Sequence, residues 1–445
     1  MEDNTGKNRG MQLLVLGLFC TGLLLCIVFG WSVLYALLFG LILFLLYGKS
    51  RGFSWQELGR LALKGVMTVK NILMVFVLIG MLTALWRASG TIAVIVCYAS
   101  ALIRPSLFLL MAFLLNCGLS TLTGTSFGTA ATIGVICAAM GTALKINPLL
   151  TGGAILSGAF FGDRCSPVST SALLVAAVTE TDIYDNIKGM LRSALVPFLL
   201  AAAAYAAIGF ALPHEGELLN PKELFSRSFV LSPVSLLPAA AIIILALFRV
   251  DVKLAMAASI AVSIPVCLAV QKLQGPELMK AMLTGFYPED PEVAAMISGG
   301  GIASMLRVGG IVCLSSSYSE LFRETGLLDG VGQAVSALRE KTTNFTATLV
   351  TAVVSGMIAC NQTLAILLTN QICGKEYTDK THLAVDLEDT AVVIPPLIPW
   401  SIAGAVPLAT VGAPAASVLF AFYLIAIPLW RLIRSLTEKQ RRMAC

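Results

Sequence analysis

Residues 116–129 interrupt an apolar region with hydroxyl groups and glycines. The apolar stretches on either side are about 15 residues long, and we expect each to be too short to cross a bilayer alone. The centre of the segment is Thr123, Gly124, Thr125 and Ser126. We predict a re-entrant hairpin whose carbonyl and hydroxyl oxygens, freed at membrane depth, can bind a small cation. The alternative is close helix packing through small residues.

A second segment, 158–170, combines a carboxylate with a helix-start signal. Ser166 and Pro167 are typical of the beginning of a helix, so we predict one broken crossing that ends near Gly162 and resumes at Ser166. Asp163 lies in this break, where a cation or proton could meet it, and Ser169 and Thr170 follow. The free N–H groups of the new helix suit an anion. Alternatively, Asp163 pairs with Arg164 in a surface loop.

The second half of the chain repeats both patterns. The turn of a second predicted hairpin carries Asn361, Gln362 and Thr363, and residues 388–401 contain three prolines that predict a second broken crossing. The separation from hairpin to break is similar in the two halves, 123 to 167 and 361 to 399. The further candidates in this second break are Glu388, Asp389, Thr390, Trp400 and Ser401.

The composition indicates the elements that must hold these residues. The chain has 445 residues, of which 57% are hydrophobic and 12% charged, whereas soluble chains carry about 25% charged residues. Residues 342–374 and 390–430 contain no Asp, Glu, Lys or Arg. We therefore predict an all-α polytopic membrane protein with about 10–12 transmembrane helices, which excludes most classes of soluble enzyme.

The net charge of +5 comes from basic residues beside the predicted spans. Such clusters mark the cytoplasmic side, so we expect a multi-pass protein of the cell membrane with both termini in the cytoplasm. No nucleic-acid partner is expected. The 11 cysteines have no metal-site or disulfide spacing, and no cofactor is predicted.

A weak internal repeat with an offset of 220 residues joins the two halves, as Glu57 and Glu277 illustrate. Two spans and an amphipathic stretch occur in each half: 12–28, 31–47 and 55–64, then 231–247, 254–270 and 276–283. The next apolar segment ends in Arg87 in one half and Arg307 in the other. The loop 272–292 is acidic where its counterpart is basic, which predicts two inverted repeats, a plan typical of secondary transporters. The predicted divisions are a first repeat (1–212), a polar linker (213–228), a second repeat (229–435) and a basic tail (436–445).

Other functional classes fit less well. Residues 124–128 match the GxSxG pattern of a serine nucleophile, but that pattern needs a strand–turn–helix context and a base. No phosphate-binding loop of the GxxxxGK[ST] type is present. We therefore expect no enzymatic activity; a channel is the remaining alternative to a carrier.

At these segments the chain resembles the NhaC family of sodium/proton antiporters, and the run DRCSP at 163–167 is the most specific match. The resemblance implies an exchanger of sodium and protons, and some members couple such gradients to malate and lactate. Two positions depart from the pattern: Thr170 replaces a carboxylate, and Ser401 replaces an asparagine. The matching stretches are 89–92, 124–129, 132–134, 157–167, 176–178, 300–305, 388–389 and 398–400.

The resulting prediction is a secondary active transporter with alternating access to a midplane cation site. Asp163, Thr123 and Asn361 are the predicted sodium ligands, and Asp163, Glu388 and Asp389 are the predicted proton acceptors. Sodium and a proton would compete for one negative group, because a bound cation stabilises an ionised carboxylate. The alternative cargo is a small organic acid or amino acid, held by the helix ends at Ser166 and Thr390 and by Asn361. The expected surroundings are the lipid bilayer, and a homodimer is compatible with the sequence.

Overall fold

The computed structural model describes residues 2–29, 31–102, 104–167, 169–212, 221–248, 250–327 and 342–444. Within these ranges the chain forms helices and no strand, apart from an isolated bridge between Phe286 and Gly299. The predicted all-α class is therefore confirmed. Residues 213–220 of the predicted linker lie outside the described residues. Helix α23 continues through residue 436, where the sequence predicted a separate tail.

The first half begins with the two predicted spans and the amphipathic helix. These are α1 (Glu2–Val28), α2 (Val33–Ser50) and α3 (Trp55–Met67). Next come α4 (Lys70–Ala88) and α5 (Thr91–Leu102), bent by 63° relative to each other around Gly90, whose φ is +72°. The remaining helices are α6 (Phe108–Thr123), α7 (Ser126–Thr129), α8 (Val135–Ala143), α9 (Pro148–Cys165), α10 (Thr170–Thr179) and α11 (Ile183–Ala211).

The second half follows a similar order. It contains α12 (Pro221–Ser226), α13 (Leu237–Leu247), α14 (Val252–Pro265), α15 (Gly275–Thr284), α16 (Pro291–Ile297) and α17 (Ile302–Thr325). It ends with α19 (Asn344–Ala359), α20 (Gln362–Cys373), α21 (Lys380–Glu388), α22 (Ile402–Thr410) and α23 (Phe422–Ala444). One predicted correspondence fails: Arg87 lies in the last turn of α4, whereas Arg307 lies near the start of α17. The reason is that the glycines at 299–301, all with positive φ, break the chain before Arg307.

The amphipathic helices α3 and α15 begin in the same way. The Glu57 carboxylate accepts a hydrogen bond from the backbone N–H of Ser54 at 2.8 Å, and the Glu277 carboxylate accepts one from Gln274 at 3.0 Å. Both are capping boxes, in which the third helical residue satisfies a free N–H at the helix start. Residues 220 positions apart thus form the same kind of helix start in the two halves.

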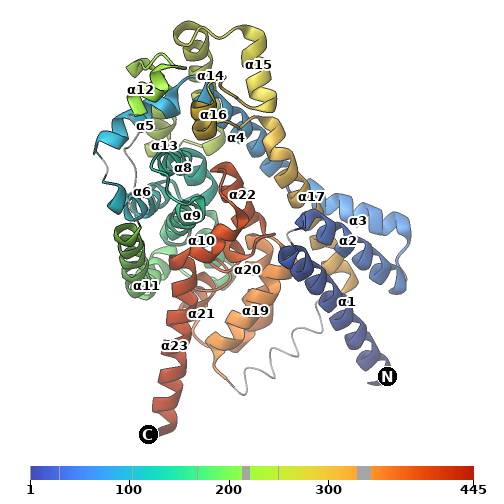
Figure 1. Cartoon of the computed structure of the whole chain (residues 1–445). Coiled ribbons are helices and arrows are strands. Elements are labelled where there is room, and N and C mark those ends of the chain that lie inside the picture. Colours follow the sequence, from blue (N-terminus) through green and yellow to red (C-terminus); the bar gives the residue numbers. More distant parts are fainter. Residues whose placement is uncertain are drawn as a thin grey trace.

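The two halves pack into each other rather than side by side. Helix α17 of the second half lies against α2, α3 and α4 of the first (Figure 1). One close contact is at Gly80, whose carbonyl accepts a hydrogen bond from the N–H of Gly301 at 2.8 Å. A Cβ on Gly80 would lie 2.7 Å from the Gly301 oxygen, so this contact requires glycine. Both chain ends lie at the same end of the molecule (Figure 1).

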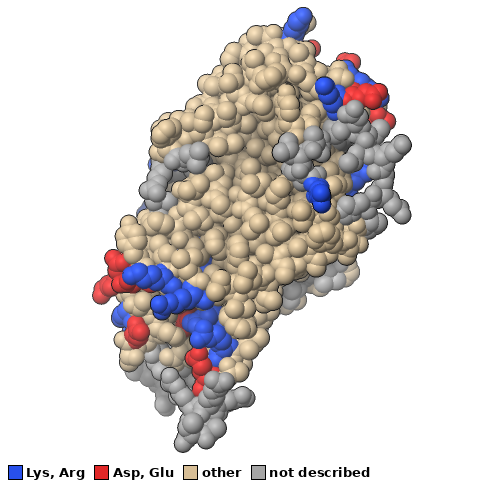
Figure 2. Space-filling model, turned by 90° about the vertical axis from the view of Figure 1, so that its left-hand side faces the viewer, with Lys and Arg blue, Asp and Glu red and all other residues tan. Residues whose placement is uncertain are grey.

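The surface is that of a membrane protein. Figure 2 shows a face whose charged side chains gather at its two ends, with a broad uncharged area between them. Five described helical segments are long and apolar enough to span a bilayer, and the bent α4–α5 pair would be a sixth. The total of 10–12 crossings stays a prediction. The five segments are 33–50, 105–123, 126–143, 183–211 and 253–270.

One expectation about the first hairpin was wrong. Its two arms, 105–123 and 126–143, have 19 and 18 residues and pass the length and hydropathy test for a span. The sequence suggested shorter arms because the polar residues near the turn were counted as loop. Instead they are helical, and hydroxyls such as Thr121 and Thr132 donate to carbonyls of the preceding turn at 2.8 and 2.7 Å.

Candidate ion-binding site

The first hairpin turns within two residues. Helix α6 ends at Thr123, and Gly124 takes a left-handed conformation with φ +65°. Thr125 then caps α7, its hydroxyl accepting from the N–H of Gly128 at 3.3 Å. The hydroxyl of Thr123 lies 3.4 Å from that of Thr129. The backbone N–H of Ser126, the first residue of α7, faces the carboxylate of Asp163.

The second hairpin uses the same sequence of conformations. Helix α19 ends at Ala359, Cys360 is left-handed with φ +56°, and Asn361 caps α20. The Asn361 side chain accepts from the N–H of Leu364 at 2.8 Å and donates to the carbonyl of Ala359 at 3.1 Å. Gln362, the first residue of α20, reaches the first half of the chain, as described below. Both turns therefore occur within the predicted segments, although Gln362 and Thr363 already belong to α20. That the two hairpins are re-entrant stays a prediction.

The first broken segment is real, but its boundaries differ from those predicted. Helix α9 continues through Asp163 to Cys165, and α10 begins at Thr170 after the cap Ser169, whose hydroxyl accepts from Ala172 at 3.4 Å. Ser166 does not start the helix: its hydroxyl donates to the carbonyl of Thr121 at 2.7 Å. This contact exists because α6 and α9 pack very closely. A Cβ on Gly162 would lie 2.1 Å from the α6 backbone.

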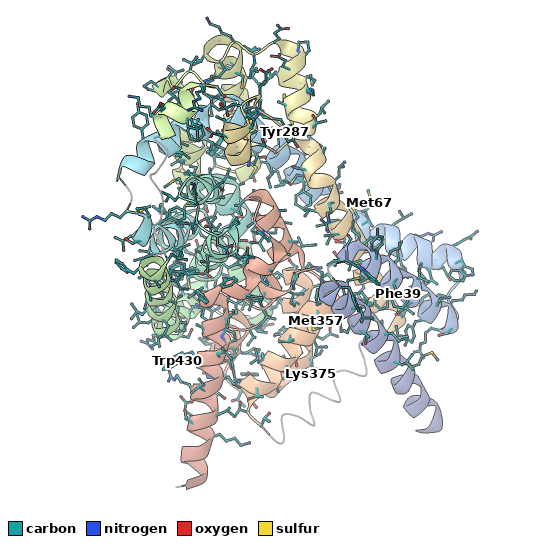
Figure 3. The ribbon with its side chains drawn as sticks, in the orientation of Figure 1. Phe39, Met67, Tyr287, Met357, Lys375 and Trp430 are labelled. Carbon is teal, nitrogen blue, oxygen red and sulfur yellow. The ribbon has the colours of Figure 1, made fainter. Side chains whose placement is uncertain are left out.

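The second broken segment is longer. After α21 ends at Glu388, residues 389–401 form turns and one short 3-10 helix, 395–397, at the prolines. Ser401 then caps α22, accepting from Ala403 at 3.4 Å. The indole N–H of Trp400 donates to the carbonyl of Met357 at 3.0 Å, which ties the break to α19. Figure 3 places Met357 between Tyr287 near one end of the molecule and Lys375, and much closer to Lys375.

These segments converge on Asp163, which is 4% exposed. Its Oδ2 atom accepts hydrogen bonds from the hydroxyl of Ser171 and from the amide of Gln362, both at 3.2 Å. The Ser169 hydroxyl and the Ser126 N–H face the same carboxylate. Every one of these partners is a neutral donor, and no ion pair with Asp163 occurs among the described residues. The site is thus a buried carboxyl group that accepts hydrogen bonds from neutral donors and forms no ion pair with the described residues.

A separate charged network lies beside it. Arg164, fully buried, forms an ion pair with Asp389 and also donates to the hydroxyl of Ser193 at 2.8 Å. Arg431 of α23 lies on the other side of Asp389, with its Nε atom 3.0 Å from Oδ2, and pairs with Asp386 as well. The alternative of an Asp163–Arg164 pair in a surface loop was therefore wrong. Both side chains are buried, and the arginine bonds to an aspartate 225 residues away.

Glu388 differs from the other acidic residues of this region. It is fully buried, and neither of its carboxylate oxygens has a hydrogen-bond partner among the described residues. The charged groups that face it are Asp163, Arg164 and Asp389. A buried polar group without a partner is uncommon in proteins and calls for an explanation.

The remaining candidates lie at the edge of the site. Thr170 and Thr363, at the starts of α10 and α20, are exposed. The hydroxyl of Thr390 donates to the carbonyl of Asp386 at 2.6 Å. Sequence reasoning did not select Ser171, Asp386 or Arg431. The available signal was that Asp386 and Asp389 lie three residues apart, on one face of a helix, but nothing local pointed to Arg431.

The site has the features of a membrane transporter. Two helix turns and two helix breaks meet around ionisable side chains that are shielded from the bilayer, and intramembrane carboxylates of this kind are typical of ion pathways. No group of three His, Cys, Asp or Glu side chains suited to a resident metal occurs in the described ranges. The GxSxG match at 124–128 lies in a helix–turn–helix, so it lacks the strand that a serine nucleophile requires.

Comparison with known proteins identifies the family. The sequence profile of the Na+/H+ antiporter family matches residues 10–179 and 160–433, and the chain belongs to this family. The resemblance to NhaC is also confirmed. The Na(+)/H(+) antiporter NhaC of Alkalihalophilus pseudofirmus is 26% identical over 87% of this chain and 86% of its own length.

Two further relatives have other cargoes in their names. The malate-2H(+)/Na(+)-lactate antiporter of Bacillus subtilis is 27% identical over 87% of this chain and 86% of its own length. The arginine/ornithine antiporter ArcD of Halobacterium salinarum is 28% identical over 84% of this chain and 80% of its own length.

Proposed function

We propose that the chain exchanges sodium for protons across the membrane and that the two cations compete for Asp163. The observation that carries this proposal is the environment of Asp163: a buried carboxylate with neutral donors on one side and no basic partner among the described residues. A cation supplies the missing charge, and the ionised carboxylate then becomes the favoured form. A proton bound at the same group cancels the charge instead.

The oxygen atoms near the two turns complete the proposed sodium site. Thr123 and Asn361, which flank the left-handed residues of the two turns, supply a hydroxyl and an amide oxygen. Helix interruptions at this depth expose carbonyl oxygens, which bind hard cations in water-excluded sites. Ser126, Ser169 and Gln362 hold Asp163 in place rather than binding the ion. Asp389 is left out of the ligand set because two arginines already balance its charge.

The test is transport by purified protein in proteoliposomes under separate sodium and pH gradients. Asp163→Asn should abolish sodium-dependent proton flux, because a neutral amide cannot exchange one cation for another. Asp185→Asn is the matched control, since Asp185 is an exposed carboxylate paired with Lys188 at 2.9 Å. Undiminished flux in Asp163→Asn would remove this residue from the mechanism.

A coupled organic cargo is the second candidate, supported by the malate/lactate and arginine/ornithine relatives. In that case the capped helix starts at Asn361 and Ser401 would supply N–H groups for a substrate carboxylate. Thermal-shift measurements with malate, lactate and arginine, each with and without sodium, distinguish the two. Stabilisation by one of these solutes only in the presence of sodium would favour coupled transport.

We also propose a plasma-membrane location with both termini in the cytoplasm. This orientation is supported by the basic residues next to the ends of the chain and by the position of both ends on one side of the molecule (Figure 1). Reporter fusions to each end, active only in the cytoplasm, test it. An inactive reporter at either end would contradict it.

A further inference from the structure

Two helices lead away from Asp163 in the same direction. Ser171 and Gln362, near the starts of α10 and α20, both donate to its carboxylate. About two turns further on, the Asn370 amide donates to the carbonyl of Val178 at 3.3 Å, so the helices run parallel and stay in contact. They have 10 and 12 residues. At 1.5 Å per residue their length is about 15–18 Å, which is about half the thickness of the hydrocarbon layer of a bilayer.

One side of this helix pair is exposed along its length. Ala177 directly precedes the contact at Val178, and Gln371 directly follows the contact at Asn370. In two parallel helices these two positions lie on the same side of the pair. The exposed positions recur every three or four residues and so form one row on each helix, Thr170, Leu173, Ala177 and Glu180 on α10 and Thr363, Leu367 and Gln371 on α20. The two rows make one continuous face, the α10–α20 face, which begins beside Asp163.

The α10–α20 face differs in composition from a face that meets lipid. Within residues 195–211 of the long helix α11, every exposed side chain is apolar, and Leu195, Leu199 and Phe210 are among them. By contrast, four of the seven exposed positions of the α10–α20 face are Thr, Gln or Glu. Polar side chains within spans typically face the protein interior or a water-filled cavity. The composition of the α10–α20 face therefore favours contact with water.

The helices that lead from the site towards the other end of the molecule are closed. These are the segment 126–143, which includes α8, and α22, which begins at the second break (Figure 1). Residues 126–141 and 401–410 contain no exposed position. A surface pocket of about 330 Å³ lies near the far ends of these helices, and Ala138 is its lining residue nearest to Ser126 along the first of them. The pocket therefore stops about three helical turns from Ser126.

From this contrast we infer that water and cations reach Asp163 along the α10–α20 face, from the side of the membrane on which both chain ends lie. Lys375, which follows α20, lies towards that end of the molecule (Figures 1 and 3). Asp163 needs such a route because an unpaired ion does not cross an apolar region unaided. The structure is then open to one side and closed along α8 and α22 to the other. The inference rests on the proposed function and adds the route to its ion site.

Cysteine substitution tests which face meets water. Leu173→Cys and Leu195→Cys are a matched pair, since both replace a leucine and the two leucines are 46% and 60% exposed. A charged, membrane-impermeant methanethiosulfonate reacts with the thiolate, which forms readily in water and hardly at all in lipid. In sealed vesicles it should modify Leu173→Cys at least about tenfold faster than Leu195→Cys. Reaction is expected from the side on which a C-terminal tag is open to protease, and mass spectrometry of the modified peptide, with the unsubstituted protein as background, identifies the site.

The outcomes separate this inference from the proposed function. Modification of Leu173→Cys at the rate of Leu195→Cys, or only from the opposite side, overturns the route while leaving sodium/proton exchange intact. A wild type without sodium-dependent proton flux overturns the exchange, whereas water access to the α10–α20 face is still decided by the labelling. If Leu173→Cys does not fold, Ala177→Cys on the same row answers the same question. Modified Leu173→Cys should also lose sodium-dependent proton flux, because the bulky adduct lies on the route, and modified Leu195→Cys should keep it.

Discussion

The two halves of the molecule build the same backbone turn but place their charges differently. Each hairpin has a left-handed residue, then a capping residue, then a helix whose first residue faces Asp163: Ser126 in one half and Gln362 in the other. The aspartates next to the two breaks, however, have opposite surroundings. Asp163 has neutral donors, whereas Asp389 lies between two arginines.

This difference indicates different roles for the two aspartates: Asp163 is available to bind a cation, whereas Asp389 stabilises the structure. A carboxylate already neutralised by arginine gains little from a second cation, while an unneutralised one in the same environment gains the full interaction. Arg164 itself comes from the first half and neutralises the aspartate of the second. The first half thus stabilises the second and leaves its own carboxylate available.

The largest expected effect is on stability, from Asp389→Asn. It leaves Arg164 buried without its anion, which should lower the free energy of unfolding by about 3–5 kcal/mol. Asp163→Asn should lower the free energy of unfolding much less, because Asp163 has no ion-pair partner that the substitution would leave unpaired. Denaturant unfolding of the detergent-purified variants, followed by circular dichroism, measures both. The double variant Arg164→Gln/Asp389→Asn should recover part of the loss, and equal losses in the two single variants would contradict the comparison.

The next effect is on transport, from Gln362→Leu. The amide of Gln362 stabilises ionised Asp163, and a hydrogen bond to a charged group contributes about 1.5–3 kcal/mol. Its loss favours the protonated form, so sodium competes less well. At fixed pH, KM for sodium should rise about tenfold or more, and the pH at which uptake is half-maximal should move upward.

A variant on the same helix controls for packing. Asn370→Leu removes an amide that donates to the carbonyl of Val178 at 3.3 Å, away from Asp163. It should leave KM for sodium and the pH profile unchanged. A shift in the opposite direction for Gln362→Leu would show that the amide does not favour the ionised carboxylate.

A smaller effect is expected at the first turn. Gly124→Ala places a Cβ on a residue with φ +65°, which costs about 1–2 kcal/mol of unfolding free energy. Gly118→Ala, within the helical part of α6 and with no atom near the added Cβ, should be neutral or slightly stabilising. Thermal unfolding of the two variants in parallel measures the difference, and equal melting temperatures would count against a strained turn.

The smallest effect is expected at the equivalent position of the second turn. Cys360 already carries a Cβ at φ +56°, so Cys360→Gly should relieve strain. Relative to Cys360→Ala, which also removes the buried thiol, this gain is partly offset by the greater freedom of glycine in the unfolded chain, leaving a net stabilisation of up to about 1 kcal/mol. Cys360→Ala keeps the Cβ and should show no gain. The same thermal assay tests both variants.

Several features of this structure were predictable from sequence because they depend on neighbours along the chain. Ser54 and Glu57 cap α3, Asn361 caps α20, and prolines keep residues 395–399 out of a regular α-helix. The misplaced helix start at Ser166 shows where this reasoning fails. Its hydroxyl could cap a helix, but close packing of α6 against α9 offers it the Thr121 carbonyl instead.

The amino-acid sequence by itself determined the membrane class, the position of the two turns and the presence of carboxylates near them. Only the tertiary structure decided which carboxylate has no ion-pair partner, because Arg164 and Arg431 reach their aspartates from distant parts of the chain. Hydrophobic length and helix capping are local, and so they can be read along the chain. Electrostatic neutralisation depends on distances of a few ångströms between side chains, and those distances exist only after the two halves have packed together.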